Sequence, residues 1–443
     1  MKIGNTYLSE LLGDRFDVSF QLGNNASTSF IKHNPHKPLG EIAEFSSESW
    51  DQKSIFADIF PYIEIGNVDI TTGEISAIEP ISIKDAPSRA KKIVRKNDIL
   101  VSTTRPNRGA ICLYEQDEIS IASTGFSIIR NIDNNIIRDF LFVMLRMPFS
   151  LEQMRLRSSG GNYPAIIESE LKKILIPIPQ KEVQEHIINI YSKAQQARLE
   201  KQQEAKQLLE SIDDYLLEAL KIKRVRNTNF NKVSIIQNIS SLLGGRLDPQ
   251  QFHQERVEAV EKIKMGNWCR LKDVRYDVKS VSKKIPSGET YIGMENIDSC
   301  TGDYMESKEK EIVSSAARFK EGDILFPKLR PYLNKVHRSQ FDGYCSTEFH
   351  VFEAHDILPD FLTVVLRSSL TLAQTKHLMT GNTLPRLQTN DVEDLILPNP
   401  EISKQEEIVK HIYGLKDKAK QLQKEGDALL EEAKQKIEKM IIG

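Results

Sequence analysis

The chain has 443 residues, of which 40% are hydrophobic and 28% are charged, with only 22 Gly and 18 Pro. This composition excludes collagen-like, mucin-like and wholly disordered chains, and the length exceeds what one hydrophobic core serves, so we expect at least two folded domains. The 60 Lys and Arg residues against 62 Asp and Glu residues leave a formal net charge of -2. A nucleic-acid-binding face must therefore be a local basic patch.

The spacing of the cysteines and the hydropathy of the chain indicate in which cellular compartment the protein is found. The four cysteines lie far apart without a C-x-x-C pair, which favours neither a zinc site nor a disulfide framework; they are Cys112, Cys269, Cys300 and Cys345. The opening MKIGNTYLSE lacks the apolar segment of a secretion signal, and no run of about 18 apolar residues occurs. We therefore expect a cytoplasmic protein without a membrane span.

The second half of the chain repeats the first half in the same order, at an offset of about 221 to 231 residues. Short phrases return with their internal spacing kept: LLGDRFD (11–17) as LLGGRLD (242–248), YIEIGNVDITTG (62–73) as YIGMENIDSCTG (291–302), NDILVSTTRP (97–106) as GDILFPKLRP (322–331), STGF (123–126) as STEF (346–349), FLFVMLR (140–146) as FLTVVLR (361–367), and LKKILIPIP (171–179) as VEDLILPNP (392–400). The sequence thus predicts a duplicated architecture.

In chain order, we expect a first globular domain over residues 1–179, a long helix over 180–222, a second globular domain over 223–400 and a second long helix over 401–443. Each globular part mixes short alternating apolar runs with helical patches, which is typical of a mixed α/β (α+β) fold. The predicted fold is therefore a tandem duplicate of α/β domains, each followed by a long helix.

Both long helices carry an apolar seam. In the second helix, apolar residues from Ile408 to Met440 follow alternating spacings of four and three, with Gly426 in the one slot that lacks a side chain. The first helix repeats this from Val183 to Ala219 around the polar centre RLEKQQE. Neither helix can bury its seam alone, so we expect them to pair as an antiparallel coiled coil that relates the repeats by a pseudo-two-fold axis.

Catalytic signatures are missing from the sequence. Neither a G-x-x-x-x-G-K-[ST] phosphate loop nor a G-x-G-x-x-G motif occurs. His33 and His36 lack an acidic or Cys cluster that would complete a metal site. Ser123 and Ser346 recur without an attendant His and Asp, so we interpret them as strand or turn residues. We expect no catalytic and no metal-binding residue in this chain.

Four loops, two in each repeat, combine Arg or Lys with turn formers and aromatic residues: 103–110, 155–165, 327–335 and 379–387. Arg can meet guanine or a phosphate, Asn can pair with adenine, and Gly permits close approach to the DNA backbone. The alternative is that these turns are buried or salt-bridged and brace the domain. The predicted DNA-binding residues are Arg105, Asn107, Arg108, Arg155, Arg157, Asn162, Tyr163, Lys328, Arg330, Tyr332, Asn334, Lys335, Asn382 and Arg386.

Each repeat also ends in a related phrase, LKKILIPIPQKEVQEHI (171–187) and VEDLILPNPEISKQEEIV (392–409), with Gln184 and Gln405 in register. Together with GNTLPRLQTNDVEDL (381–395), these phrases make the chain resemble the DNA-specificity subunit of a type I restriction-modification enzyme. The resemblance covers essentially the whole chain. One departure is Ala165, which stands where the second repeat has Arg386, so we expect the first half of the site to be read with different contacts.

The resemblance implies a non-catalytic subunit in which each globular part is a target-recognition domain for one half of a split double-stranded DNA site. The paired helices would then set the spacing between the halves. It also implies two methyltransferase subunits, which carry S-adenosylmethionine and modify adenine, and motor-nuclease restriction subunits, which use ATP and Mg. No cofactor is expected on this chain itself.

Two other functions compete with this interpretation. A two-module protein-interaction scaffold with a coiled-coil rod fits the composition nearly as well, but it would lack duplex affinity and the steep salt dependence of a DNA reader. A self-sufficient methyltransferase would need a cofactor motif that the sequence does not contain. The recognised bases depend on side-chain placement in the groove, which the sequence does not predict.

Overall fold

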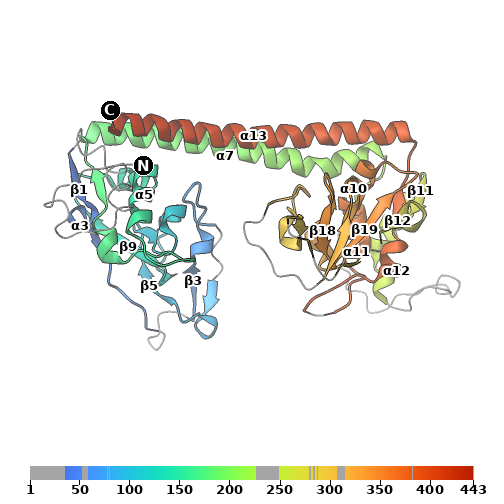
Figure 1. Ribbon diagram of the computed structural model, residues 1–443, viewed down its shortest axis with the longest axis horizontal. Helices are drawn as coiled ribbons and strands as arrows, with labels where there is room; N and C mark the ends of the chain where they lie inside the picture. The colour runs from blue at the N-terminus through green and yellow to red at the C-terminus, as the bar shows by residue number, and fades with distance from the viewer. Residues whose placement is uncertain are drawn as a thin grey trace. The chain divides into compact units, whose positions relative to one another are not determined.

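The computed structural model describes residues 35–442 apart from 52–57, 77, 79, 226–248, 279–280, 283–284, 287, 307–314 and 382. The repeated phrases at 11–17 and 242–248, together with His33 and Asn382, lie outside the described residues. The chain divides into two compact units, Met1–Glu200 with Lys424–Gly443 and Lys201–Gln423 (Figure 1). Each unit contains one globular domain and a part of both long helices.

The first unit is built around two four-stranded sheets and a two-stranded sheet, with strand orders β2-β9-β6-β7, β4-β3-β8-β5 and β1-β10. Its elements are β1 (His36–Pro38), α3 (Leu39–Ile42), β2 (Ala43–Phe45), β3 (Ile59–Ile63), η2 (Ile65–Asn67), β4 (Pro80–Ser82), η3 (Ile83–Asp85), β5 (Ala90–Val94), β6 (Ile99–Ser102), η4 (Pro106–Arg108), β7 (Ile111–Leu113), β8 (Ser120–Ser123), β9 (Phe126–Ile132), α4 (Arg138–Leu145), α5 (Pro148–Arg157), α6 (Glu168–Leu171), β10 (Leu175–Pro177) and the start of α7 (Lys181–Ala219).

The second unit has strand orders β12-β19-β16-β17, β13-β15-β18-β14 and β11-β20. After the end of α7 come η5 (Pro249–Phe252), α9 (Gln254–Lys264), β11 (Trp268–Arg270), η6 (Leu271–Asp273), β12 (Arg275–Asp277), β13 (Val281–Ser282), β14 (Tyr291–Ile292), η7 (Met294–Asn296), β15 (Ala316–Phe319), β16 (Ile324–Pro327), η8 (Pro331–Leu333), β17 (His337–Arg338), β18 (Gly343–Ser346), β19 (Phe349–Ala354), α10 (Pro359–Arg367), α11 (Ser369–Thr375), α12 (Thr389–Glu393), β20 (Ile396–Pro398) and α13 (Ile402–Ile442).

The two domains share one topology, which confirms the predicted duplicated α/β fold. The order β2-β9-β6-β7 corresponds to β12-β19-β16-β17, and β1-β10 corresponds to β11-β20. The parallel pairing of β3 with β8 returns as the parallel pairing of β14 with β18. Even the register repeats, because Ile99 opposes Leu113 in the first domain and Ile324 opposes Arg338 in the second.

One inner strand of each domain, β6 or β16, is buried on both faces. In β6, Ile99 and Val101 pack in the core formed with the helices, whereas Leu100 between them packs in a second core. Since side chains alternate across a strand, β16 does the same, with Leu325 on the opposite side from Ile324. This explains why DILV and DILF are continuous apolar runs.

The long helices pack antiparallel within each unit, as the seams predict. In the first unit, Ile187 of α7 shares a core with Ile437 of α13. In the second unit, Leu216 of α7 shares a core with Ile408. Residue numbers therefore rise along one helix as they fall along the other. Among the described residues, no helix is long and apolar enough to cross a membrane.

An ion pair with α13 is formed by the first residue of the polar centre of the α7 seam. The Arg198 side chain is buried, and its Nε lies 2.7 Å from Asp427 Oδ1. Gly426 makes room for it, because a Cβ there would stand 3.3 Å from Arg198 Cγ. The missing side chain at Gly426 thus lets Arg198 pack closely against α13.

Candidate nucleic-acid interface

In the first domain, two loops that are far apart in sequence join into one structure. Thr104 and Ser159 each form a β-bridge with Ala165. The Arg105 N–H donates to the Pro164 carbonyl at 2.7 Å, and the Ile166 N–H donates to the Thr103 carbonyl at 2.9 Å. Residues 103–110 and 158–165 are called the first loop pair below.

The second domain builds the same arrangement. Leu329 and Thr380 each form a β-bridge with Arg386. The Arg330 N–H donates to the Pro385 carbonyl at 2.9 Å, and the Leu387 N–H donates to the Lys328 carbonyl at 3.0 Å. Residues 328–335 and 379–387 are the second loop pair. The four loops predicted separately therefore form two equivalent surfaces, one in each domain.

Arg105 and Arg330 occupy the same unusual backbone conformation. Their φ values are 48° and 46°, in the left-handed region, directly before the proline that begins η4 or η8. A non-glycine residue there is strained, and such strain persists only where surrounding structure holds it. Arg105 Nη2 donates to the Asn162 carbonyl at 2.9 Å, and Arg330 Nη2 donates to the Thr383 carbonyl at 3.3 Å. Both arginines thus brace their loop pair while remaining partly accessible.

An arginine behind each loop pair fixes its position; Arg146 is buried and Arg367 is half-buried. Arg146 at the end of α4 donates to the carbonyls of Gly109, Ile111, Ile70 and Thr71. Arg367 of α10 donates to the carbonyls at the four equivalent positions, Asn334, Val336, Ser299 and Cys300. Gly73 and Gly302 must remain glycines beside them, because both have positive φ and a Cβ would stand 2.7 or 2.6 Å from the guanidinium. We did not predict this role from the sequence, although Arg146 and Arg367 are the last residues of the repeated phrase FLxVxLR.

The tips of the loop pairs are exposed. Asn107 and Arg108 form the tip of the first loop pair, and the equivalent residues of the second are Tyr332 and Leu333, which are 47% and 36% exposed. Tyr163 is 68% exposed, and the Arg105 guanidinium lies 4.2 Å from its ring centroid. The exposed Asn162 lies beside it. These side chains are accessible on the surface of their loop pair, and their contact with DNA stays a prediction.

Other predicted residues are turned toward the protein. Arg157 is only 6% exposed, and its Nη1 pairs with Glu170 at 3.1 Å, which corrects its assignment to a DNA-facing surface. Lys328 donates to the Thr347 carbonyl, and burial lowers the pKa of its ammonium. Asn334 donates to the Arg367 carbonyl and Lys335 to the Met294 carbonyl. DNA contact by the last three stays a prediction.

Arg155 and Arg386 are ion-paired near the surface. Arg155 binds Glu152 of its own helix through two bonds of 2.7 Å. Arg386 binds Glu348 through bonds of 2.9 and 2.8 Å, and its guanidinium lowers the pKa of the Glu348 carboxyl below its ordinary value. In the first domain the equivalent positions are Ala165 and Gly125, so the ion pair is replaced as a unit. The sequence already shows that only the second domain has this carboxylate, because STGF of the first repeat becomes STEF in the second.

The remaining sequence predictions concern chemistry away from the loops. Ser123 is the last residue of β8, and Ser346 is the last residue of β18. The Oγ atom of each accepts a hydrogen bond from the backbone N–H two residues later, as expected of strand and turn residues. His253, Glu255 and His377 gather their ligand atoms within 4.8 Å. However, the two imidazoles stack at 3.5 Å, so their lone pairs do not converge, and Lys376 already pairs with Glu255 at 2.5 Å. We assign no metal there.

The glutamine of the repeated closing phrase has a structural role. Gln184 is fully buried; its Oε1 accepts the Ile137 N–H at the start of α4, and its Nε2 donates to the carbonyls of Asn135 and Pro179. Gln405 repeats this, accepting the Leu358 N–H and donating to the Pro400 carbonyl. The phrase therefore ties the start of each long helix to the helix at the domain core.

Comparison with known proteins places these features in a family context. Residues 35–210 match the family model described as the type I restriction modification DNA specificity domain. The specificity subunit of the type I restriction enzyme HindI from Haemophilus influenzae is 29% identical over 155 residues, which cover 34% of this chain and 33% of that protein. The chain thus aligns with about a third of the length of this relative.

Two further relatives align over longer stretches. The EcoDI specificity subunit from Escherichia coli is 23% identical over 62% of each chain, and the MjaIX specificity subunit from Methanocaldococcus jannaschii is 23% identical over 85% of each. A solved structure concerned with complex assembly of a type I R-M system has a TM-score of 0.47 and 19% identity, over 92% of this chain and 97% of that one. The family model and the relatives confirm the resemblance predicted from the repeated phrases: this chain is similar to the specificity subunits of type I restriction-modification enzymes.

Proposed function

We propose that this chain is the sequence-specific DNA-recognition subunit of a type I restriction-modification complex. Each globular domain reads one half of a bipartite double-stranded site, and the paired helices α7 and α13 set the gap between the halves. The chain performs no catalysis itself. It directs adenine methylation and restriction by partner subunits in the cytoplasm.

The observation that carries this proposal is the double occurrence of the loop pair. Each domain joins two distant loops beside an arginine in the left-handed conformation, anchors them with a second arginine, Arg146 or Arg367, and exposes a tip at equivalent positions. Polar and aromatic side chains on a rigid loop are suited to base edges and phosphates in a groove. A protein that recognises two different half-sites needs the same supporting structure in both domains and different residues at the tips of the loops.

The partners follow from the division of labour in such complexes. Two methyltransferase subunits would carry S-adenosylmethionine, and restriction subunits would use ATP and Mg. Support comes from three relatives, the HindI, EcoDI and MjaIX proteins, which are specificity subunits of type I restriction enzymes. The helices α7 and α13 each carry many exposed residues along their length, on which such subunits can assemble.

Salt-dependent duplex binding tests the proposal. The purified full chain is titrated with a fluorescent pool of randomised duplexes at several salt concentrations, and bound duplexes are sequenced. We expect enrichment of a motif with two specified halves and a fall of affinity with rising salt. A chain that binds no duplex at low salt, alone or with its methyltransferase subunits, would instead be a protein-interaction scaffold.

A further inference from the structure

The second unit contains a cavity of about 310 Å³ that is lined by residues of α7, α10, α11 and α13. Its apolar lining residues come from all four helices and are Leu209, Ile212, Leu216, Val364, Leu372 and Ile412. Arg367 and Lys416 also line the cavity, together with Glu210 and Asp213. Because cations and carboxylates balance in this lining, we expect the ligand to be largely apolar and uncharged.

One donor of the lining lacks a partner. Arg367 binds four backbone carbonyls, all of them through Nη1 and Nη2. Within the part of the chain that the structure describes, its Nε forms no hydrogen bond. Two more lining residues contain a buried oxygen without a partner among the described residues, Asn334 through Oδ1 and Ser369 through Oγ. Unpaired polar groups cost free energy, so a ligand that pairs with them gains affinity.

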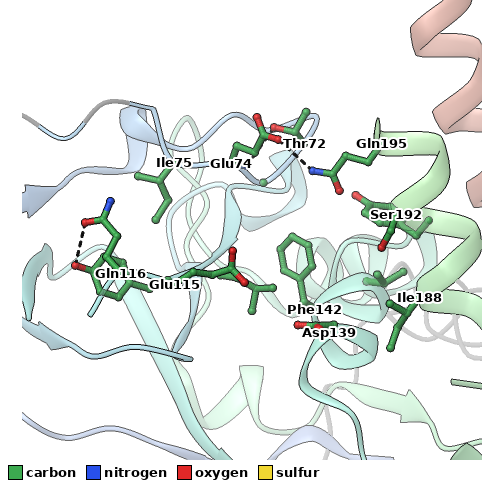
Figure 2. A pocket seen from close by; sticks show the side chains of 15 residues that line it. Thr72, Glu74, Ile75, Glu115, Gln116, Asp139, Phe142, Ile188, Ser192 and Gln195 are labelled. Atoms are coloured by element: carbon green, nitrogen blue, oxygen red, sulfur yellow. Dashed lines mark hydrogen bonds between the residues drawn. The ribbon is translucent and has the colours of Figure 1, made fainter. Parts of the chain in front are cut away.

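The first unit shows what occupies the equivalent space there. Arg146 is the counterpart of Arg367, and its Nε donates to the Tyr191 hydroxyl at 3.3 Å. Tyr191 of α7 is only 2% exposed. Figure 2 shows that Ser192, the next residue of α7, lines a pocket together with Phe142 of α4, so this stretch of α7 faces the domain. A phenol that belongs to the chain itself therefore satisfies the arginine Nε in the first unit.

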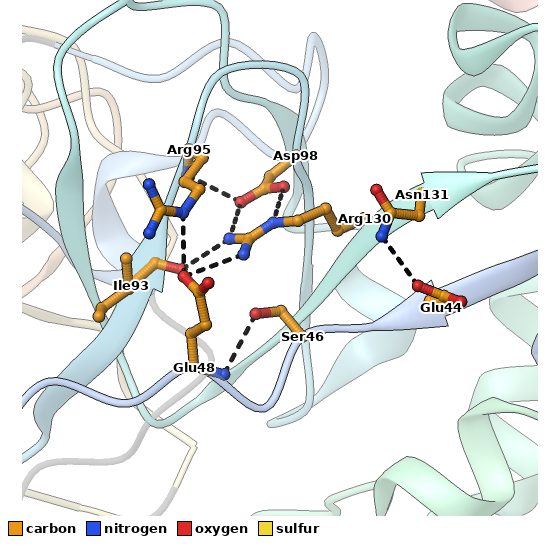
Figure 3. A network of polar contacts seen from close by, with 8 residues as sticks. All are labelled: Glu44, Ser46, Glu48, Ile93, Arg95, Asp98, Arg130 and Asn131. Atoms are coloured by element: carbon orange, nitrogen blue, oxygen red, sulfur yellow. Dashed lines mark hydrogen bonds and ion pairs between the residues drawn. The ribbon is translucent and has the colours of Figure 1, made fainter.

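An oxygen opposite an arginine Nε occurs a second time in the first domain. Arg130 Nε donates to Asp98 Oδ1 at 2.7 Å, within the polar network that Figure 3 shows. Hydrogen bonds from a charged donor are stronger than those between neutral groups. An oxygen of a ligand is therefore a suitable partner for the Nε of Arg367.

Smaller side chains of the second unit stand where the first unit has this phenol. Ile412 corresponds to Tyr191, and Ser368 corresponds to Met147. Tyr191 and Met147 are both buried in one core, which also contains Leu430 and Ile437 of α13. Ile412 has neither the ring nor the hydroxyl of tyrosine, and both Ile412 and Ser368 line the cavity. The cavity thus lies at the positions that a tyrosine and a methionine fill in the first unit.

We propose that the cavity of the second unit binds a small phenolic molecule. Its hydroxyl oxygen accepts a hydrogen bond from Arg367 Nε, as the Tyr191 hydroxyl accepts one from Arg146. Its ring packs against apolar lining residues such as Leu216 and Leu372. None of the evidence comes from the exposed tips of the loop pairs, so the inference does not depend on DNA recognition.

The lining favours a phenol over an aromatic acid. Glu210 and Asp213 line the cavity, so a carboxylate of the ligand would meet like charges. A phenol is uncharged at neutral pH, because its pKa is about 10. Its hydroxyl can also donate a proton, for which Asn334 Oδ1 and Ser369 Oγ are unpaired acceptors.

Titration calorimetry on the full chain tests this, with p-cresol as the probe and toluene as the control ligand that lacks the hydroxyl. We expect p-cresol to bind at one site per chain and toluene to bind at least about tenfold more weakly, the effect of one hydrogen bond to a charged group. Methyl NMR of the unaltered chain is expected to place the p-cresol-induced shifts at Ile412 and Leu372. Shifts at Ile437 of the first unit instead would overturn the site.

Two variants fill the cavity with the residues of the first unit. Ile412→Tyr brings its own phenol to Arg367, so we expect it to abolish p-cresol binding. Ser368→Met is expected to weaken p-cresol binding at least about tenfold by occupying part of the space. Lys410→Tyr, which adds the same side chain at an exposed position of α13, is the matched control and is expected to leave binding unchanged. Melting temperatures without probe show that each variant is folded.

Three results would contradict the proposal. Equal binding of p-cresol and toluene would remove the role of the hydroxyl, and unchanged p-cresol binding by folded Ser368→Met or Ile412→Tyr would remove the site. Tighter binding of 4-methylbenzoate than of p-cresol would identify an aromatic acid as the ligand. Tighter binding of N-acetyl-L-tyrosine amide than of p-cresol would overturn the assignment to a free small molecule, because it would identify a tyrosine side chain of a protein as the occupant.

Discussion

The two globular domains have the same frame but different exposed tips. Strand order, register, the arginine in the left-handed conformation and the four carbonyls bound by Arg146 or Arg367 all repeat. At the tips, Asn107 and Arg108 of the first domain correspond to Tyr332 and Leu333 of the second. The residues that hold the loops in place are thus the same in both domains, whereas the exposed residues at the tips differ. We therefore expect the shared residues to position the loops and the differing residues to recognise DNA.

The largest expected effect comes from removing a positioning residue. Arg146→Met removes the donor to four carbonyl oxygens, through two buried and two part-buried hydrogen bonds, so we expect a loss of about 3 kcal/mol in the free energy of unfolding. Arg367→Met is expected to have a similar effect in the second domain. Chemical denaturation measures both, with Arg155→Met at the surface as control. A small effect at either site would mean that the two frames are not equivalent.

The next largest loss of stability is expected from replacing the glutamines of the repeated closing phrase, Gln184 and Gln405. Gln184→Leu removes the acceptor of the Ile137 N–H and the donor to two carbonyls, which we expect to cost about 2 kcal/mol. Gln405→Leu is expected to match it. Hydrogen exchange at the Ile137 and Leu358 amides reports each change locally. Unaltered protection of these amides would contradict the role assigned to the glutamines.

Exchanging the tips tests recognition. Asn107→Tyr combined with Arg108→Leu gives the first domain the tip of the second. We expect roughly 10- to 100-fold weaker binding to the native site, the range for a lost base-reading contact, and a shallower salt dependence, because a cation is lost. The melting temperature is expected to stay unchanged. Lys84→Leu, an exposed basic residue outside the loops, is the control. Equal losses for both variants would indicate a nonspecific charge effect.

The smallest effect concerns the ion pair that only the second domain has. Arg386 lowers the pKa of Glu348. A lowered carboxyl pKa adds stability that is present above the unfolded-state pKa and is lost as pH falls through the folded-state value. In Arg386→Ala we therefore expect the pKa of Glu348 to rise toward 4.5, and the acid-side loss of stability to become less steep. Carboxyl NMR titration measures this; an unshifted pKa would show that the pair does not form.

The sequence predicts the frame well, because repeated phrases and seams are local patterns. The duplicated α/β domains and the antiparallel packing of the helices follow from DILV, DILF and the apolar seams. The joining of loops more than 50 residues apart does not follow, since it depends on tertiary contacts such as Arg105 Nη2 to Asn162 O. Sequence reasoning grouped Arg155 with Arg157, although residues two apart on a helix point to different sides. Asn382 stays a prediction, outside the described residues.

The central claim is that each domain carries its own half-site specificity on a shared frame. A chimera in which residues 223–400 are replaced by a second copy of residues 1–179 tests it most directly. The chimera is expressed with its methyltransferase subunits, and methylated adenines are mapped across the host genome by sequencing. We expect a motif with the half-site of the first domain in both halves, in inverted order. Retention of the half-site of the second domain in the chimera's motif, or the appearance of two unrelated halves, would contradict the account.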